Sequence, residues 1–76
     1  MRPMKGKAPN RLRVLRAERD VAQEVLAHKV GIKPSRYWRI EHGLKDPTQQ
    51  EVTKLARELR VPVDALGFTH IEAQAS

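Results

Sequence analysis

Side chains that could perform covalent or metal chemistry are scarce in this sequence of 76 residues. It contains no cysteine and three histidines, which lie at positions 28, 42 and 70. Those histidines lack the close helical spacing of metal-binding motifs such as H-E-x-x-H. The sequence also offers no nucleophile–base pair and no paired carboxylates at a usable spacing. We therefore expect a protein that is not an enzyme and that needs no metal or cofactor.

Two nearby arginines offer the chemistry of recognition instead. Arg36 and Arg39 lie three residues apart in a segment with helical periodicity, on the side away from Tyr37 and Ile40. A guanidinium can donate two parallel hydrogen bonds to O6 and N7 of guanine in the major groove of DNA. Both arginines are therefore candidate base-reading residues. The alternative is that one or both, Arg36 in particular, only clamp phosphates.

The positive charge is concentrated toward the N-terminal end. The chain carries a formal net charge of +6, and residues 1–19 hold seven basic residues against Glu18 alone. Residues 1–10 combine two prolines and a glycine with few apolar groups, so we expect a flexible basic arm. Arg2, Lys5 and Lys7 in this arm are candidates for contacts to phosphates along a duplex. The alternative is a tail that only improves solubility.

Signals of a membrane or secreted protein are missing from the sequence. No apolar run approaches the ~18 residues of a membrane span. No apolar stretch follows the basic N-terminus, as it would in a secretory signal. Residues 1–10 also lack a hydrophobic face that could enter a membrane surface. We therefore expect a cytoplasmic, nucleoid-associated protein whose polyanionic partner is a nucleic acid.

Two short helices are predicted in the first part of the chain. Asn10 is a suitable N-cap for a helix that starts at Arg11. This helix should stop near Asp20, because aspartate tolerates the left-handed backbone conformation that helix ends often need. A second helix, over residues 23–30, is predicted to end at Gly31.

Three further helices complete an all-α fold. Pro34 suits the first position of the third helix, where its missing N–H costs nothing, and Gly43 ends that helix. Thr48 and Glu51 have the spacing of a capping box at the start of the fourth helix, which Pro62 breaks. A short fifth helix is expected from the apolar residues Val63, Leu66 and Phe68. The tail over residues 69–76 carries no clear signal.

The second and third predicted helices are joined by a turn of three to four residues centred on Gly31. A turn this short forces a steep crossing, and Ala27 is small enough to let the two helices approach closely. This is the arrangement of a helix-turn-helix motif. The second helix of such a pair fits the major groove, which is about 12 Å wide.

Several blocks of the sequence, in order, resemble the phage repressor/Cro-type (xenobiotic-response-element-like) helix-turn-helix family. The resemblance covers roughly residues 11–68. The matching blocks are Leu15–Arg16, V-A-Q-E-x-L-A at 21–27, Gly31–Ile32, R-I-E-x-G at 39–43, D-P-T at 46–48 and L-A-x-x-L-x-V-x-x-D-x-L at 55–66.

The resemblance implies a compact, lambda-repressor-like bundle of about five short helices over residues 11–68. It also implies a regulator of transcription that binds specific sequences of double-stranded DNA, acting as a repressor by occupying a promoter. Such a protein is expected to form a homodimer on a palindromic operator, with half-sites about one helical turn, ~34 Å, apart. Leu66, Phe68 and Ile71 are apolar residues near the C-terminal end that would suit the dimer contact.

Five positions take their expected roles from this resemblance. Arg16 and Glu41 match an ion pair that links the first helix to the end of the third, and a planar guanidinium suits such a pair. The alternative role of Arg16 is a contact to a phosphate. Gln23 matches a position that bonds a phosphate at the start of the second helix, where the helix dipole is favourable. His42 and Lys45 resemble loop contacts to the same DNA backbone.

Three residues around the start of the third helix complete the set of candidates. Ser35 resembles a contact position and could bond a base edge or a phosphate, or simply face solvent. Lys33, just before the helix, is expected to touch the DNA backbone rather than a base. Trp38 could pack against a thymine methyl group or the sugar backbone, and its alternative role is to cover part of a thin core.

Three departures from the family pattern are expected to lower stability. Ala22 replaces the usual Ser or Thr N-cap of the second helix, at a cost of about 1 kcal/mol. Tyr37 replaces an aliphatic residue on the inward face of the third helix. Arg60 occupies a helix end that the family usually gives to glycine.

A second hypothesis is that the same fold mainly holds a protein, as in an antitoxin or an adaptor. The partner would then be a toxin or another protein, and DNA binding could coexist with it. Val14, Val25 and Trp38 would form part of the apolar docking patch.

Overall fold

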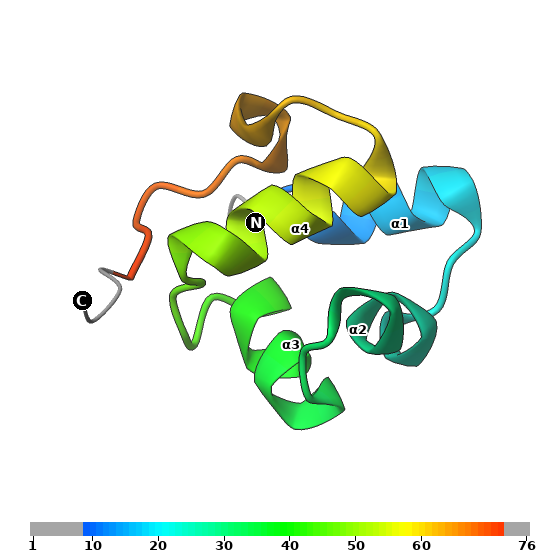
Figure 1. Cartoon of the computed structure of the whole chain (residues 1–76), viewed down its shortest axis with the longest axis horizontal. Helices are drawn as coiled ribbons and strands as arrows, with labels where there is room; N and C mark the ends of the chain where they lie inside the picture. The colour runs from blue at the N-terminus through cyan, green and yellow to red at the C-terminus, as the bar shows by residue number, and fades with distance from the viewer. Residues whose placement is uncertain (1–8, 73–76) are drawn as a thin grey trace, which may run out of the picture.

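The computed structural model describes residues 9–72 and consists of four α-helices and one 3₁₀ helix (Figure 1). The helices are α1 (Leu12–Arg19), α2 (Gln23–Val30), α3 (Pro34–Glu41), α4 (Gln49–Leu59) and the 3₁₀ helix η1 (Val63–Leu66). α2 and α3 lie on one side of α4, and η1 packs on the other. The all-α prediction is confirmed, although the fifth helix is a single 3₁₀ turn.

The core takes at least one side chain from every helix. Tyr37 and Ile40 of α3 are fully buried, so the inward face of α3 is the predicted one. The other fully buried large apolar side chains are Leu12, Leu26, Val52, Leu55, Leu59 and Leu66. The burial of Leu66 corrects the expectation that this residue is free for a dimer contact. Its place in the core follows from the packing of η1 against α4.

Several helix ends follow the predicted local signals. Asp20 ends α1 with φ 55° and Gly31 ends α2 with φ 72°, so both left-handed stops are confirmed. Pro34 is the first residue of α3, as predicted. Arg60 ends α4 with φ 59°, a conformation that costs a residue with a Cβ atom roughly 1–2 kcal/mol.

The start of the domain includes Asn10, which the sequence placed at the end of the flexible arm. The N-cap of α1 is Arg11, so the prediction that Asn10 is the N-cap is wrong by one residue. The Oδ1 atom of Asn10 accepts a hydrogen bond from the backbone N–H of Leu12, the first residue of α1, at 3.0 Å. Its Nδ2 donates to the carbonyl oxygen of Ile40 at 3.0 Å. Asn10 is therefore a buried link between α1 and α3, and the boundary of the predicted arm must lie before it. Residues 1–8 are outside the described part of the chain.

The end of α3 brings the backbone close to Pro9. The helix ends at Glu41, His42 is its C-cap, and Gly43 follows with φ 76°. A Cβ atom added at Gly43 would lie 2.6 Å from the Cβ atom of Pro9. Both the left-handed backbone and this close approach require glycine at position 43.

The C-terminal segment returns to the loop between α3 and α4. The backbone N–H of Glu72 donates to the carbonyl oxygen of Pro47 at 2.7 Å, and an isolated bridge pairs Thr48 with Glu72. This contact puts the side chain of Glu72 beside the first turn of α4. Among residues 9–72, no helix is long and apolar enough to cross a membrane.

The capping box at the start of α4 is formed as predicted. The Thr48 hydroxyl accepts a hydrogen bond from the backbone N–H of Glu51 at 3.1 Å. The Glu51 carboxylate accepts one from the backbone N–H of Thr48 at 2.9 Å. These two bonds satisfy donors that the first turn of a helix cannot pair internally.

Replacing Thr48 by alanine is expected to lower the free energy of unfolding by about 1 kcal/mol, because the backbone N–H of Glu51 loses its acceptor. Urea denaturation of the two proteins measures the difference. Thr53→Ala is the matched control, since the Thr53 hydroxyl lies on the exposed face of α4 and donates only to the carbonyl oxygen of Gln49. Equal losses in the two variants would contradict a capping role for Thr48.

Candidate nucleic-acid interface

The turn between α2 and α3 holds the two helices at a fixed crossing. Gly31 adopts a left-handed conformation, and the backbone N–H of Ile32 donates to the carbonyl oxygen of Ala27 at 2.9 Å. Ala27 and Ile32 are both buried, so the turn is anchored in the core. Pro34 then starts α3 with a backbone angle already suited to a helix. The pair has the geometry of a helix-turn-helix motif.

The outer face of α3 presents polar and aromatic side chains to solvent. Ser35, Trp38 and Arg39 are exposed, and Tyr37 and Ile40 on the opposite face are buried. The Arg39 guanidinium makes no ion pair with any residue in the described range 9–72. Its donors therefore stay available for an external acceptor such as a guanine edge.

Arg36 is placed differently from Arg39. Its Nε donates to Oε2 of Glu51 at 2.7 Å, and its Nη2 donates to Oε1 of the same carboxylate at 2.9 Å. Nη2 also lies 3.3 Å from Oε1 of Glu72. These bonds raise the pKa of Arg36 above its usual range. Base reading by Arg36 would therefore require breaking a two-point ion pair with α4, which makes Arg39 the better placed of the two arginines.

Trp38 and His42 stack on one another at the C-terminal end of α3. Their ring centroids lie 4.0 Å apart with an interplanar angle of 23°. Nδ1 of His42 lies 2.8 Å from the carbonyl oxygen of Trp38. Because a carbonyl oxygen only accepts, Nδ1 is the donor in this contact. Trp38 is 45% exposed, so its ring borders the same surface as Arg39.

A buried carboxylate ties the helix-turn-helix together. Glu41 accepts hydrogen bonds from Nε and Nη2 of Arg16, both at 2.8 Å, so the ion pair expected between α1 and α3 is present. The Tyr37 hydroxyl donates to Glu41 at 2.6 Å, and Nε2 of Gln23 donates to it at 2.9 Å. The carboxylate thus joins α1, α2 and α3 through charge-assisted hydrogen bonds.

The electrostatics of this cluster follow from its burial and its donors. Burial by itself raises the pKa of Glu41, but the hydrogen bonds from Arg16, Tyr37 and Gln23 outweigh it, and the pKa lies below its usual range. The hydrogen bond to Glu41 raises the pKa of Arg16. Burial, followed by the hydrogen bond to Glu41, raises the pKa of Tyr37. Arg16 and Glu41 therefore stay ionised, and Tyr37 stays neutral, at neutral pH.

Tyr37 thus supplies one of the hydrogen bonds that stabilise the buried Glu41 carboxylate. Its hydroxyl is buried and would be unsatisfied without an acceptor, and Glu41 one helical turn later supplies that acceptor. Gln23 was expected to bond a phosphate, and in the structure its amide nitrogen is already bonded to Glu41. The spacing of Tyr37 and Glu41, four residues apart, was the signal in the sequence that could have indicated this bond.

The remaining predicted contact residues lie around the same helix. Lys33 is the N-cap of α3 and is exposed. Lys45 is exposed in the loop between α3 and α4. Arg2, Lys5 and Lys7 fall outside the described residues.

The stability of the domain is expected to fall in acid. Burial alone raises the pKa of Glu51, but hydrogen bonds from Arg36 and Thr48 lower it below its usual range, as for Glu41. Below about pH 4.3, the unfolded chain binds more protons than the folded one, so stability is present above that pH and is lost as pH falls. Urea midpoints measured from neutral pH to about pH 3 should therefore decline. In Glu51→Gln this decline should be shallower, and an unchanged decline would contradict a contribution from Glu51.

The exposed α3 face, set on a short turn and a buried ion pair, defines a nucleic-acid-binding domain of the helix-turn-helix class. Residues 12–66 match the sequence profile of the helix-turn-helix family. The chain belongs to this family.

Named relatives agree with this assignment. The restriction-modification controller protein C.AhdI from Aeromonas hydrophila has 31% sequence identity to this chain. Its crystal structure superimposes with a TM-score of 0.69, over 72% of this chain and 83% of that chain. The cryptic phage CTXphi transcriptional repressor RstR of Vibrio cholerae is 37% identical over 57 residues, which are 75% of this chain. The match spans about half (51%) of the length of RstR.

A third similarity concerns the fold alone. The crystal structure of the hypothetical transcription factor NHTF from Neisseria superimposes with a TM-score of 0.71 over 86% of each chain, with 18% sequence identity. The two proteins therefore share the arrangement of their helices, although most of their residues differ.

Proposed function

We propose that this chain is a DNA-binding regulator of transcription that recognises specific sequences of double-stranded DNA through the outer face of α3. The observation that carries the proposal is the contrast between the two faces of this helix. The inner face is fixed by the core and by Glu41, and the outer face offers Arg39 without an ion-pair partner in the described residues. A rigid helix with free donors is what reading of a major groove requires.

The exposed residues of this surface divide into two roles. Arg39 reads a guanine, Ser35 bonds a base edge or a phosphate, and Trp38 packs against the sugar backbone or a thymine methyl group. The residues assigned to phosphates are Lys33, His42, Lys45, Arg2, Lys5 and Lys7. Gln23 joins them through the second hydrogen of its amide nitrogen, since Glu41 accepts only the first. Phosphate contacts fix the position of the protein on the duplex but carry no sequence information themselves.

We propose further that the protein represses transcription as a homodimer on a palindromic operator. The similarity to a phage transcriptional repressor and to a restriction-modification controller protein supports the regulatory role. Of the residues expected at the dimer contact, Phe68 packs partly against the core, and Ile71 is 39% exposed. Ile71 is therefore the better candidate for a contact with a second copy.

Selection of randomised duplex DNA by the purified protein tests this function. The proposal expects an enriched consensus with two inverted half-sites about one helical turn, ~34 Å, apart. An enriched but asymmetric single site would contradict the palindromic operator while keeping sequence recognition. Absence of any enriched sequence would contradict sequence-specific binding.

Deletion of residues 1–8 is expected to weaken DNA binding by a similar factor on all sequences. The deletion removes Arg2, Lys5 and Lys7 but keeps Asn10, whose hydrogen bonds stabilise α1 and α3. Each lost phosphate contact should lower the slope of log affinity against log salt by about 0.9. Titrations at several salt concentrations measure this slope. An unchanged slope would show that the arm does not touch DNA.

A further inference from the structure

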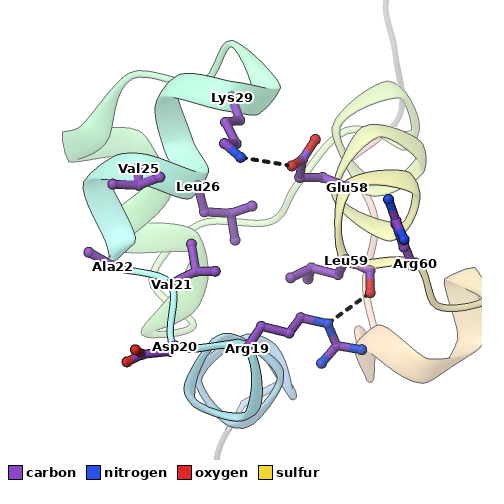
Figure 2. A pocket seen from close by; sticks show the side chains of 10 residues that line it. All are labelled: Arg19, Asp20, Val21, Ala22, Val25, Leu26, Lys29, Glu58, Leu59 and Arg60. Atoms are coloured by element: carbon purple, nitrogen blue, oxygen red, sulfur yellow. Dashed lines mark hydrogen bonds and ion pairs between the residues drawn. The ribbon is translucent and has the colours of Figure 1, made fainter.

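A pocket of about 440 Å³ opens where the C-terminal ends of α1 and α4 meet α2 (Figure 2). Leu26 of α2 and Leu59 of α4 are almost fully buried and form its floor. Val21, Ala22 and Val25 line the side formed by α2 and the segment before it. Val25 is 48% exposed, so the apolar surface continues out of the pocket along α2.

The opposite side of the pocket is cationic. Nε of Arg19 donates to the carbonyl oxygen of Leu59 at 2.9 Å, which holds this guanidinium against the end of α4 (Figure 2). Arg60 follows directly and makes no ion pair with a residue in the described range. Lys29 and Glu58 face each other across the rim at 3.6 Å and largely neutralise one another. The apolar wall thus shares the pocket with two arginines and one carboxylate, Asp20. Arg19 also pairs with Glu18 at 3.4 Å.

The backbone conformation singles out the same pocket. Asp20 and Arg60 are the residues other than glycine with positive φ in the described part of the chain, and both line this pocket. Aspartate adopts this conformation readily, whereas arginine does so at a cost that glycine would avoid. Strained backbone of this kind is concentrated at functional sites. The strained backbone at Arg60 therefore points to a role for this residue beyond ending α4.

A second hollow adjoins this pocket, and we call the two together the groove between α2 and α4. The second hollow, of about 340 Å³, shares Lys29 and Glu58 with the first pocket. Its further charged and polar lining residues are His28, Lys54 and Arg57. The combined groove is therefore apolar at one end, and its basic side chains outnumber the acidic Asp20 and Glu58. This excess of positive charge complements an extended acidic segment with an apolar anchor.

This groove is separate from the surface assigned to DNA. None of the residues proposed to contact DNA in the described range lines either hollow. A ligand in the groove can therefore bind while α3 occupies a major groove.

We propose that the groove between α2 and α4 is a docking site for an acidic segment of a partner protein, which inserts an apolar side chain over Leu26 and Leu59. Carboxylates of the partner that flank this side chain accept hydrogen bonds from Arg19 and Arg60. Further acidic residues of the partner follow the groove toward Lys54. A partner protein fits better than a small molecule because the exposed Val25 extends the apolar surface beyond the pocket. The site does not depend on DNA recognition by α3.

Selection of short random peptides displayed on phage against the folded full chain tests this site. The expected consensus is an apolar residue next to aspartate or glutamate. Binding of a synthetic peptide with this consensus should weaken about tenfold or more in Arg60→Gly, since one ion-pairing guanidinium is lost. The melting temperature of Arg60→Gly should not fall, because glycine suits the left-handed end of α4.

Two further variants complete the test. Val25→Glu should also abolish peptide binding, and Arg13→Ala, an exposed position of α1 that lines neither hollow, should leave it unchanged. The three variants should bind duplex DNA as the native chain does, so the outcome is independent of the function of α3. A peptide consensus without acidic residues, or binding insensitive to both Arg60→Gly and Val25→Glu, would overturn the proposal. Release of the peptide by duplex DNA would overturn the separation of the two surfaces.

Discussion

Replacing Glu41 by alanine is expected to lower the free energy of unfolding by about 3 kcal/mol or more. The carboxylate is 3% exposed and accepts hydrogen bonds from three helices, so its removal leaves Arg16 and the Tyr37 hydroxyl without their acceptor. Removing one partner of a buried ion pair lowers stability by more than the intact pair raises it, because the other charge stays buried without compensation. For a domain of this size, the loss is a large part of the total stability.

Urea denaturation of the native chain and the Glu41→Ala variant measures this loss. Glu58→Ala is the matched control, since its ion pair with Lys29 lies at the surface and such pairs contribute little. Glu41→Gln should fall between the two, because an amide still accepts hydrogen bonds but carries no charge. Similar stabilities for Glu41→Ala and Glu58→Ala would contradict the central structural role of Glu41.

Replacing Arg39 by alanine is expected to weaken binding to the selected operator by about 1–3 kcal/mol, or roughly 5- to 150-fold. It should also relax the preference for guanine at one position, because the two donors to O6 and N7 are lost. Fluorescence anisotropy with duplexes that carry each base at that position measures both effects. Stability should change little, since Arg39 makes no ion pair with a described residue.

Arg36 is the informative control for Arg39. Its alanine variant should lose stability, because Glu51 loses its bidentate partner, and should keep the base preference of the native chain. An equal loss on operator and random DNA in Arg39→Ala would show that Arg39 is only a phosphate contact. Loss of base preference in Arg36→Ala instead would reverse the assignment of the two arginines.

Local signals were sufficient to predict the helices. Asp20, Gly31 and Pro34 act through their own backbone preferences, and the capping box of Thr48 and Glu51 spans four residues. Such effects depend on sequence neighbours alone, so their outcome is visible in the sequence. The fifth helix is shorter than predicted, because Gly67 adopts a left-handed conformation and ends it after the single 3₁₀ turn Val63–Leu66, before Phe68.

The contacts that change the roles expected of side chains connect residues far apart in the sequence. Arg36 meets Glu72, which lies 36 residues later, and Asn10 bonds Ile40 across 30 residues. Helical periodicity places Arg36 on the outward side of α3 but carries no information on which carboxylate α4 and the C-terminal segment bring beside it. The same holds for Leu66, whose burial depends on how η1 packs against α4.

The most direct measurement of the DNA-binding surface is a nuclear magnetic resonance titration of the labelled protein with its selected duplex. We expect the largest shifts at exposed positions on and around α3, namely Ser35, Trp38, Arg39 and Lys45. Signals of Val25 and Arg60 at the α2–α4 groove should stay in place. Shifts confined to that groove, with α3 unchanged, would contradict the assignment of α3 as the helix that reads DNA.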